Sequence, residues 1–309
     1  GKLLVMGGGP IGCELAQAFN RLGAEVTLVD MMPRLLSRED NDVSEFVRER
    51  FISEGIKVLT GHQSVGFERR ENETVALLDS HGENKVVAFD KVLVSVGRKA
   101  NTCGMGLENI GIELNSNGTI TVDEFLRTRY PNIYACGDVV GPYQFTHTAA
   151  HQAWYAVVNA LFGGLKKFKV DYSVIPWVTF VDPEVAHVGL SERDALAQEV
   201  PFEVTKYQLD DLDRAIAEDV AEGFVKILTV PGKDRILGAT IVGCHAGELL
   251  TEFVTAMKQG QGLKKILGTI HSYPTISEAN KFVAGDWSRK HAPERLLEWV
   301  RKYHSWKRH

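Results

Sequence analysis

Three glycines near the start of the chain have the spacing G-x-G-x-x-G, at Gly7, Gly9 and Gly12. The first glycine permits a tight turn, the second lets backbone approach a pyrophosphate, and the third lets a helix pack on a strand. Apolar residues 2–6 before the loop predict a strand, and residues 10–22 after it have helical spacing. The start of such a helix offers free N–H groups to phosphates. This context predicts a dinucleotide-binding loop, and the alternative is a glycine-rich turn in another α/β protein.

Asp30 follows the next predicted strand, residues 25–29, and lies eighteen residues past Gly12. A carboxylate at this distance accepts hydrogen bonds from the adenosine ribose of a dinucleotide. It would also repel the 2′-phosphate of NADP(H). Arg34 is close enough in sequence to be considered as a partner for that phosphate, but Asp30 holds the discriminating position. We therefore expect a preference for NAD(H) over NADP(H).

The composition narrows the possible partners of this chain of 309 residues. The formal net charge is −5, so the chain lacks the excess of basic residues that is typical of nucleic-acid-binding proteins, and we expect no nucleic acid partner. No apolar run reaches the length of a bilayer span, and we expect no membrane partner. The four cysteines form no CxxC pair, which favours a reducing cytoplasmic location and no metal site. The chain begins inside a strand pattern, so we expect residues upstream of Gly1.

The order of the predicted elements divides the chain into a parallel α/β part and a mixed part. A second helix at 41–54 and a strand at 56–59 complete a right-handed βαβ crossover. Alternating segments from 63 to 89 predict an antiparallel meander, and 92–96 a buried strand. Further elements are expected as a short strand at 133–135, a helix at 148–162, strands at 177–180, 202–208, 223–229 and 236–242, and helices at 191–198, 247–259, 263–267, 276–287 and 293–303.

Four segments, GGGPIGCELA, LVSVGRKANT, IYACGDV and HSYPTISEA, together resemble the pyridine nucleotide–disulfide oxidoreductases. The resemblance covers the whole chain in the family's order, but the FAD-binding half with its CxxxxC redox pair is absent. It implies an α/β fold: a Rossmann-like FAD/NAD(P)-binding domain with a C-terminal α+β dimerisation domain. We expect an NAD-binding domain at 1–100, the C-terminal part of an FAD domain at 101–168 and a dimerisation domain at 169–309. It also implies the cofactors NAD(H) and FAD and a homodimer.

The resemblance assigns further residues to the two cofactors. The glycine loop and Asp30 match the family's NAD site, and Glu14 occupies a helix position near the nicotinamide. Gly97 and Arg98 match the segment that joins the NAD domain to the FAD domain. Gly137 and Asp138 match the A-x-G-D motif, whose aspartate hydrogen-bonds the FAD ribityl chain in the family.

The segment around Tyr273 departs from the family pattern. In the family's disulfide reductases a histidine directly before the proline is the acid–base for the thiol, and a glutamate five positions on orients it. Here Glu278 is present, but Tyr273 replaces the histidine. A tyrosine, with an unperturbed pKa of about 10, is a poor base at neutral pH but donates a hydrogen bond. His271 is the other candidate acid–base, weighed against a surface or packing role.

These residues predict an oxidoreductase that passes hydride from NADH through flavin to a small-molecule or protein disulfide, or a related acceptor. One alternative is an enzyme similar to soluble transhydrogenase or mercuric reductase, which also carry tyrosine before that proline. The other is a non-catalytic NAD-binding and dimerisation module, since we expect the chain to be inactive alone.

Overall fold

A computed structural model of the protein describes residues 1–71 and 73–308. The chain forms two compact units, one made of residues 1–96 and 176–309 and the other of residues 97–175. The expected domain boundaries at 100 and 168 stay a prediction. Within the described residues, every helix is too short or too polar to cross a membrane.

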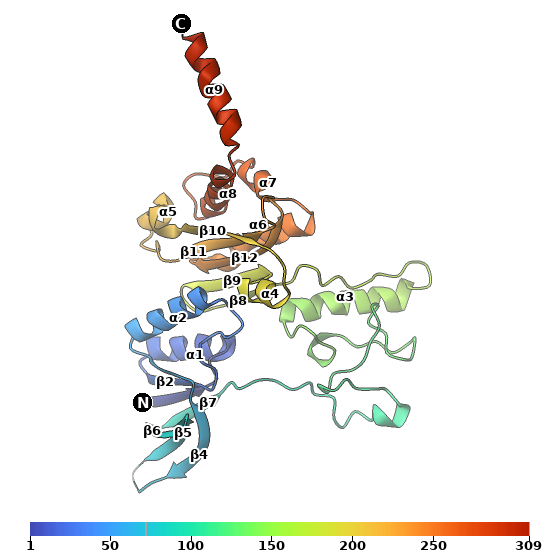
Figure 1. Ribbon diagram of the computed structural model, residues 1–309. Coiled ribbons are helices and arrows are strands. Elements are labelled where there is room, and N and C mark those ends of the chain that lie inside the picture. The colour runs from blue at the N-terminus through green and yellow to red at the C-terminus, as the bar shows by residue number, and fades with distance from the viewer. Residues whose placement is uncertain (72, 309) are drawn as a thin grey trace. The chain divides into compact units, whose positions relative to one another are not determined.

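The first unit begins with a parallel sheet of four strands in the order β3-β2-β1-β7 (Figure 1). Its helices α1 and α2 connect β1 to β2 and β2 to β3, which confirms the expected βαβ crossovers. The elements are β1 (Lys2–Met6), α1 (Pro10–Arg21), β2 (Glu25–Asp30), α2 (Asn41–Ser53), β3 (Lys57–Thr60) and β7 (Lys91–Val94). Strand β1 is an inner strand of this sheet, and the glycine loop lies at its carboxyl end.

Strand β7 was expected to be buried, and that expectation was wrong. Val92, Val94 and Val96 are all exposed. Val92 and Val94 lie opposite Leu4 and Met6, so their side chains share one face of the sheet with those residues. Because β7 is an edge strand, these valines lie at the margin of that face, where they stay exposed.

The predicted meander is confirmed as a sheet of three antiparallel strands, β4 (Gln63–Arg69), β5 (Thr74–Ser80) and β6 (Glu83–Phe89). Its apolar face packs on the parallel sheet, where Ala76 and Leu78 join Leu4 and Val29 in one buried cluster. The meander therefore covers one side of the nucleotide-binding fold.

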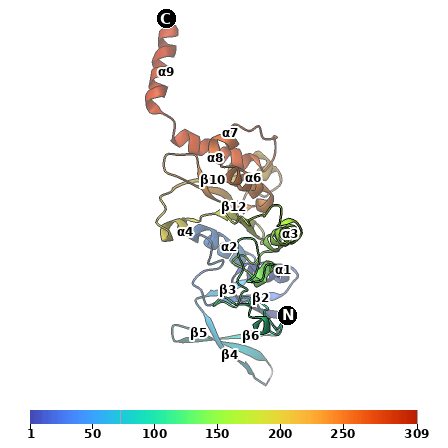
Figure 2. The same cartoon turned by 90° about the vertical axis from the view of Figure 1, so that its right-hand side faces the viewer.

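A five-stranded antiparallel sheet, in the order β10-β11-β12-β9-β8, forms the rest of the first unit. Figures 1 and 2 show α6, α7 and α8 together on one face of it. Strand β9 and helix α5 were not predicted from the sequence. The elements are β8 (Pro176–Thr179), β9 (Glu184–Gly189), α4 (Glu192–Ala197), β10 (Glu203–Gln208), α5 (Asp213–Ala217), β11 (Phe224–Thr229), β12 (Ile236–Gly243), α6 (Ala246–Lys258), α7 (Leu263–Leu267), α8 (Glu278–Lys290) and α9 (Glu294–Lys307).

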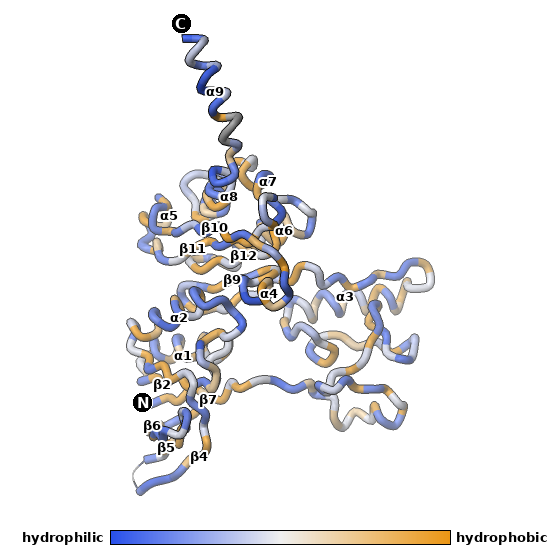
Figure 3. Tube along the Cα trace, in the orientation of Figure 1, coloured by the Kyte–Doolittle hydropathy of each residue, from blue (hydrophilic) through white to orange (hydrophobic). Residues whose placement is uncertain are grey.

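One hydrophobic core runs from the parallel sheet into the five-stranded sheet. It includes Val5 and Phe51 from the first part and Val185, Phe224 and Val242 from the second. Hydrophobic stretches, orange in Figure 3, recur along β9, β11 and β12. Burial of this shared apolar surface holds the two parts of the unit together.

The second unit has little regular structure. It contains α3 (Thr146–Phe162) and two short 3₁₀ helices, Glu108–Ile110 and Gly137–Val139. The strand expected at 133–135 was wrong, because Tyr134 forms only an isolated bridge with Arg127.

Candidate functional site

The glycine loop is shaped by two glycines that no larger residue could replace. Gly7 has φ of +104°, and a Cβ there would lie 2.5 Å from the carbonyl oxygen of Ser95. A Cβ at Gly12 would lie 1.7 Å from the carbonyl oxygen of Gly7. Gly9 is different, because within the part of the chain that the structure describes no heavy atom lies within 4 Å of the place its Cβ would take. The loop is therefore tightly packed at Gly7 and Gly12 but open at Gly9.

The start of α1 faces this open space with backbone N–H groups that have no hydrogen-bond partner among the described residues. Gly9 is the N-cap, its carbonyl accepts from the N–H of Cys13 at 2.9 Å, and no side chain caps the helix. The first N–H groups of a helix have no partner inside it, and they carry the positive end of the helix dipole. This arrangement fits the pyrophosphate of a dinucleotide.

Asp30 holds the loop from the end of β2. Its two carboxylate oxygens accept from the backbone N–H of Gly8 at 2.5 Å and of Met32 at 2.7 Å. An ionised carboxylate can accept about four hydrogen bonds, so capacity for ribose hydroxyls remains. The sequence suggested the ribose role but not this contact with the loop itself.

Cys13 lies directly under the loop and is not a redox candidate. Its thiol is buried and donates to the carbonyl oxygen of Gly8 at 3.3 Å. Burial, with Asp30 and Glu14 nearby, raises the pKa of the thiol far above its ordinary value. The residue therefore stays a protonated packing group at neutral pH.

Glu14, which was expected near the nicotinamide, contacts the five-stranded part of the first unit. Its carboxylate accepts from the backbone N–H of Phe180, just after β8, at 2.8 Å. One turn along the helix, Gln17 exchanges hydrogen bonds with the backbone of Asp182. Helix α1 is thus fixed against the segment that follows β8.

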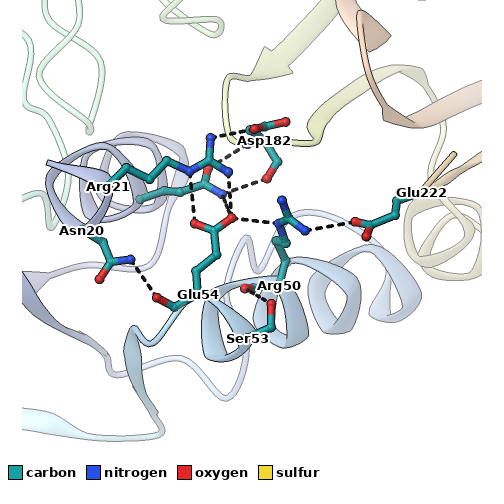
Figure 4. Close-up of polar contacts among 8 residues, drawn as sticks. Asn20, Arg21, Arg50, Ser53, Glu54, Asp182 and Glu222 are labelled. Atoms are coloured by element: carbon teal, nitrogen blue, oxygen red, sulfur yellow. Dashed lines mark hydrogen bonds and ion pairs between the residues drawn. The ribbon is translucent and has the colours of Figure 1, made fainter. Parts of the chain in front are cut away.

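An ionic network extends this contact to the end of α1 (Figure 4). Arg21 contacts Glu54 at 2.7 Å and Asp182 at 2.6 Å, and Arg50 contacts Glu54 at 2.8 Å and Glu222 at 3.2 Å. Burial alone would raise the pKa of Glu54, but the hydrogen bond from Arg21 brings it below its usual range. The network ties α1 and α2 to two loops of the five-stranded part.

A second polar cluster lies under the start of α2. The Lys226 side chain is 1% exposed, and its ammonium donates to Asp40 at 2.8 Å, Asp42 at 2.7 Å and Glu192 at 2.8 Å. Burial alone would lower the pKa of Lys226, but these three hydrogen bonds raise it above its ordinary value. The three carboxylates have the spacing of a metal site, yet Lys226 already supplies the positive charge. The lone lysine in the apolar strand sequence FVKILT was the signal that the sequence analysis missed.

In the second unit, the structure brings Arg98, from the segment expected to join the two domains, together with Asp138, the residue expected to bind FAD. Arg98 contacts Asp138 at 3.4 Å and donates to the carbonyl oxygen of Gln144 at 2.9 Å. Gly137 has φ of +82°, and its N–H donates to the side chain of Gln152 at 2.6 Å. Asp138 is half-exposed. A ligand hydroxyl therefore has access to its carboxylate, as an FAD ribityl chain would require.

Tyr273 and Glu278 have different hydrogen-bond partners. The Tyr273 hydroxyl donates to Asp213 at 2.9 Å, and this contact raises the pKa of the phenol above its ordinary value. The Tyr273 side chain is 71% exposed. Glu278 is buried and accepts from the backbone N–H of Thr275 at 3.4 Å. Among the hydrogen bonds of the described residues none joins Tyr273 to Glu278. Asp213 was not predicted from the sequence as a partner of Tyr273.

His271 is part of a polar cluster and not a surface histidine. Its Nε2 lies 3.1 Å from both carboxylate oxygens of Glu252, and its Nδ1 lies 3.1 Å from the carbonyl oxygen of Thr269. Asn280 also donates to Glu252, at 3.0 Å. Glu252 and Asn280 are partners of this cluster that were not expected from the sequence, and the acid–base role of His271 stays a prediction.

Comparisons with known proteins agree with this geometry. The model of the pyridine nucleotide-disulphide oxidoreductase family matches residues 1–153, and the model of that family's dimerisation domain matches residues 175–283. The chain belongs to the pyridine nucleotide-disulphide oxidoreductase family. The expected fold class is thereby confirmed.

Relatives in this family include two dihydrolipoyl dehydrogenases. That of Chlamydia pneumoniae is 38% identical over 90% of this chain and 59% of its own length. That of Thermus scotoductus is 37% identical over 90% of this chain and 60% of its own length. The chain thus spans about three-fifths of the length of these relatives.

Solved structures of similar fold include LpdA from Mycobacterium tuberculosis, with a TM-score of 0.83, 27% identity and coverage of 92% of this chain and 61% of LpdA. The HOCl-induced flavoprotein disulfide reductase RclA from Escherichia coli also has a TM-score of 0.83 and 27% identity, over 92% of this chain and 64% of RclA.

Proposed function

We propose that this chain forms the NAD(H)-binding and dimerisation parts of an FAD-dependent oxidoreductase. The observation that carries the proposal is the open space at Gly9 beside the uncapped start of α1. Asp30, at the adjacent strand end, would accept hydrogen bonds from the ribose and repel a 2′-phosphate. NADH would then be the electron donor, with Glu14 near its nicotinamide.

The second unit supports a flavin partner. Arg98 and Asp138 lie together and half-exposed, and Gly137 gives the backbone turn directly before Asp138. These residues would hold the ribityl part of FAD, and a bound flavin would supply two-electron redox chemistry. The names of the relatives, dihydrolipoyl dehydrogenase and flavoprotein disulfide reductase, support a disulfide or related acceptor.

Tyr273 bears on which acceptor is used. Asp213 holds its phenol protonated at neutral pH, so Tyr273 can donate a hydrogen bond but cannot serve as a base there. This favours an acceptor chemistry that does not need a histidine beside the proline. Within the family, enzymes similar to soluble transhydrogenase or mercuric reductase are the alternative that this residue supports.

The dimerisation-domain match supports a homodimer. In the family this domain brings Tyr273 and Glu278 to the partner subunit's site, so assembly and activity would be linked. The four free cysteines suit a reducing compartment, and we infer a cytoplasmic location.

Binding and redox activity can be tested separately. We expect the purified 309-residue chain to bind NADH by calorimetry and to sediment as a dimer. We expect it to be colourless and without diaphorase activity, because most of the family's FAD site lies outside it. A chain that does not bind NADH would contradict the proposed nucleotide site. A chain that sediments as a stable monomer would contradict the proposed dimerisation role.

The full-length gene product then decides between an enzyme and a binding module. Flavin absorbance that is bleached by NADH would support the oxidoreductase. A full-length product that binds NADH but never flavin would favour the non-catalytic module. A CxxxxC pair upstream of Gly1 would support dithiol chemistry, and its absence would support the transhydrogenase alternative.

A further inference from the structure

Helix α9, red at the C-terminal end of Figure 1, carries a stripe of exposed aromatic residues. Trp299 is 63% exposed, Tyr303 42% and Trp306 75%. Their spacings of four and three residues place them on one side of the helix. Their rings pack along it, with centroids 5.9 Å apart for Trp299 and Tyr303 and 6.3 Å apart for Tyr303 and Trp306. The dimerisation-domain match ends at residue 283, so this stripe lies outside the matched residues.

Basic residues border the stripe on both sides. At 100° per residue, Lys302 falls on one flank and Lys307 on the other, while Arg301 and Arg308 lie toward the opposite face. Helix α9 carries four Lys or Arg residues against two acidic residues, Glu294 and Glu298. The chain as a whole has a net charge of −5, so α9 is a basic segment on an acidic protein. A surface that attracts α9 would carry negative charge.

A second copy of α9 is a poor occupant for the stripe. Packing two stripes together would bring Lys302 and Lys307 of one helix against the same lysines of the other, and like charges beside a helical seam oppose pairing. The helix is also only 14 residues long, which is short for a stable two-stranded coil.

We propose that α9 binds an anionic membrane surface, lying along the headgroups with its aromatic stripe inserted and its lysines against lipid phosphates. Trp and Tyr favour this interface because each combines an apolar ring with a polar group. A basic amphipathic helix with aromatic residues on its apolar side is typical of such binding. The proposal revises the expectation of no membrane partner, and it does not rest on the proposed oxidoreductase function.

The test is co-sedimentation of the full chain with phosphatidylcholine vesicles that contain or lack phosphatidylserine. We expect binding at low salt only when phosphatidylserine is present, and loss of that binding at high salt. Each basic residue near an anionic surface contributes about fivefold in affinity. Lys302→Ala with Lys307→Ala should therefore weaken binding about 25-fold. The matched pair Lys85→Ala with Lys233→Ala, exposed in β6 and in the turn between β11 and β12, should leave it unchanged.

The aromatic stripe is tested by Trp299→Ala with Trp306→Ala, which should weaken binding at least about tenfold. Both side chains are exposed, so circular dichroism and NADH affinity should match those of the parent chain. Deletion of residues 294–309 should abolish vesicle binding and also leave NADH affinity unchanged.

Failure of the chain to bind anionic vesicles at low salt would overturn the proposal, as would binding that neither pair weakens. A mass in sedimentation velocity that rises with concentration, and that the tryptophan pair abolishes without any vesicle binding, would assign α9 to protein contacts instead. Binding equal for vesicles with and without phosphatidylserine would overturn the role given to the lysines.

Discussion

Lys226 on β11 donates a hydrogen bond to Asp40, the residue before α2, across 2.8 Å. Asp40 is the N-cap of α2, yet its side chain does not cap that helix. Its carboxylate instead accepts from Lys226 and from the backbone N–H groups of Glu192 and Arg193 at the start of α4, each at 3.2 Å. One buried carboxylate thus joins the nucleotide-binding part to the five-stranded part, and its charge is balanced there.

Replacement of Lys226 by methionine should destabilise the chain by about 3–5 kcal/mol, because three carboxylates would lose their buried cation. Lys206→Met is the matched control. Lys206 also contacts Asp42, at 2.8 Å, but is 30% exposed, so its loss should cost about 1 kcal/mol. Urea unfolding with unchanged slopes measures both values. Equal losses for the two variants would contradict the role given to Lys226.

The acid dependence of stability should follow Glu54. Its pKa is lowered in the folded state, so it stabilises the fold above its unfolded pKa of about 4.3. That contribution is lost as the pH falls through the lower, folded-state value. Glu54→Gln should therefore reduce stability at pH 6 and flatten its decline as the pH falls below the unfolded pKa of Glu54. Glu45→Gln, which removes an exposed ion pair with Arg48, should leave the acid profile as it is.

The elements of the nucleotide-binding part were predicted from sequence because local patterns decide them. The expected helix at 41–54 and the observed α2 at Asn41–Ser53 agree within a residue. The glycine loop was also predictable, because glycine is required at Gly7 and Gly12 by close contacts within a few residues or with the end of the adjacent strand.

Contacts between distant segments could not be predicted in this way. Lys226 and Asp40 are 186 residues apart, and Tyr273 and Asp213 are 60 apart. Nothing in the local sequence of either pair specifies its partner. The burial of residues 92–96 was misjudged for a similar reason, because the position of β7 at the sheet edge depends on the order of all four strands.

The glycine loop offers a test that separates folding from binding. Gly12→Ala would place its Cβ 1.7 Å from a backbone oxygen and should destabilise the chain by about 3 kcal/mol. Gly9→Ala meets no atom within 4 Å, so stability should change by about 1 kcal/mol or less, as for a helix N-cap. NADH affinity should nevertheless fall at least about tenfold, because the new methyl group occupies the open space.

Gly66→Ala on β4 is the control for Gly9→Ala, since its Cβ also meets no atom within 4 Å. It should preserve both stability and NADH affinity. A Gly9→Ala chain that binds NADH as tightly as the parent would remove the main support for the nucleotide site.

The preference for NADH over NADPH should depend on the charge of Asp30. Asp30→Asn keeps the size of the side chain and one oxygen for the N–H of Gly8 or Met32. Loss of a charge-assisted hydrogen bond to the ribose should weaken NADH binding roughly 10- to 100-fold. NADPH binding should weaken less or improve, since the repulsion of its 2′-phosphate disappears. Calorimetric titration with both nucleotides measures the ratio of the two affinities.

The reference variant for Asp30→Asn is Asp79→Asn, where the carboxylate accepts from the backbone N–H of Gly82 in a turn of the meander. It makes the same chemical change away from the loop and should leave the NADH-to-NADPH ratio unaltered. The remaining alternative is that Arg34 binds the 2′-phosphate of NADPH. If it does, Arg34→Ala should lower the affinity for NADPH and leave the affinity for NADH unchanged. If the ratio of NADH affinity to NADPH affinity is the same in the parent chain and in Asp30→Asn, Asp30 does not select the nucleotide. Its contacts with Gly8 and Met32 would then serve only the shape of the loop.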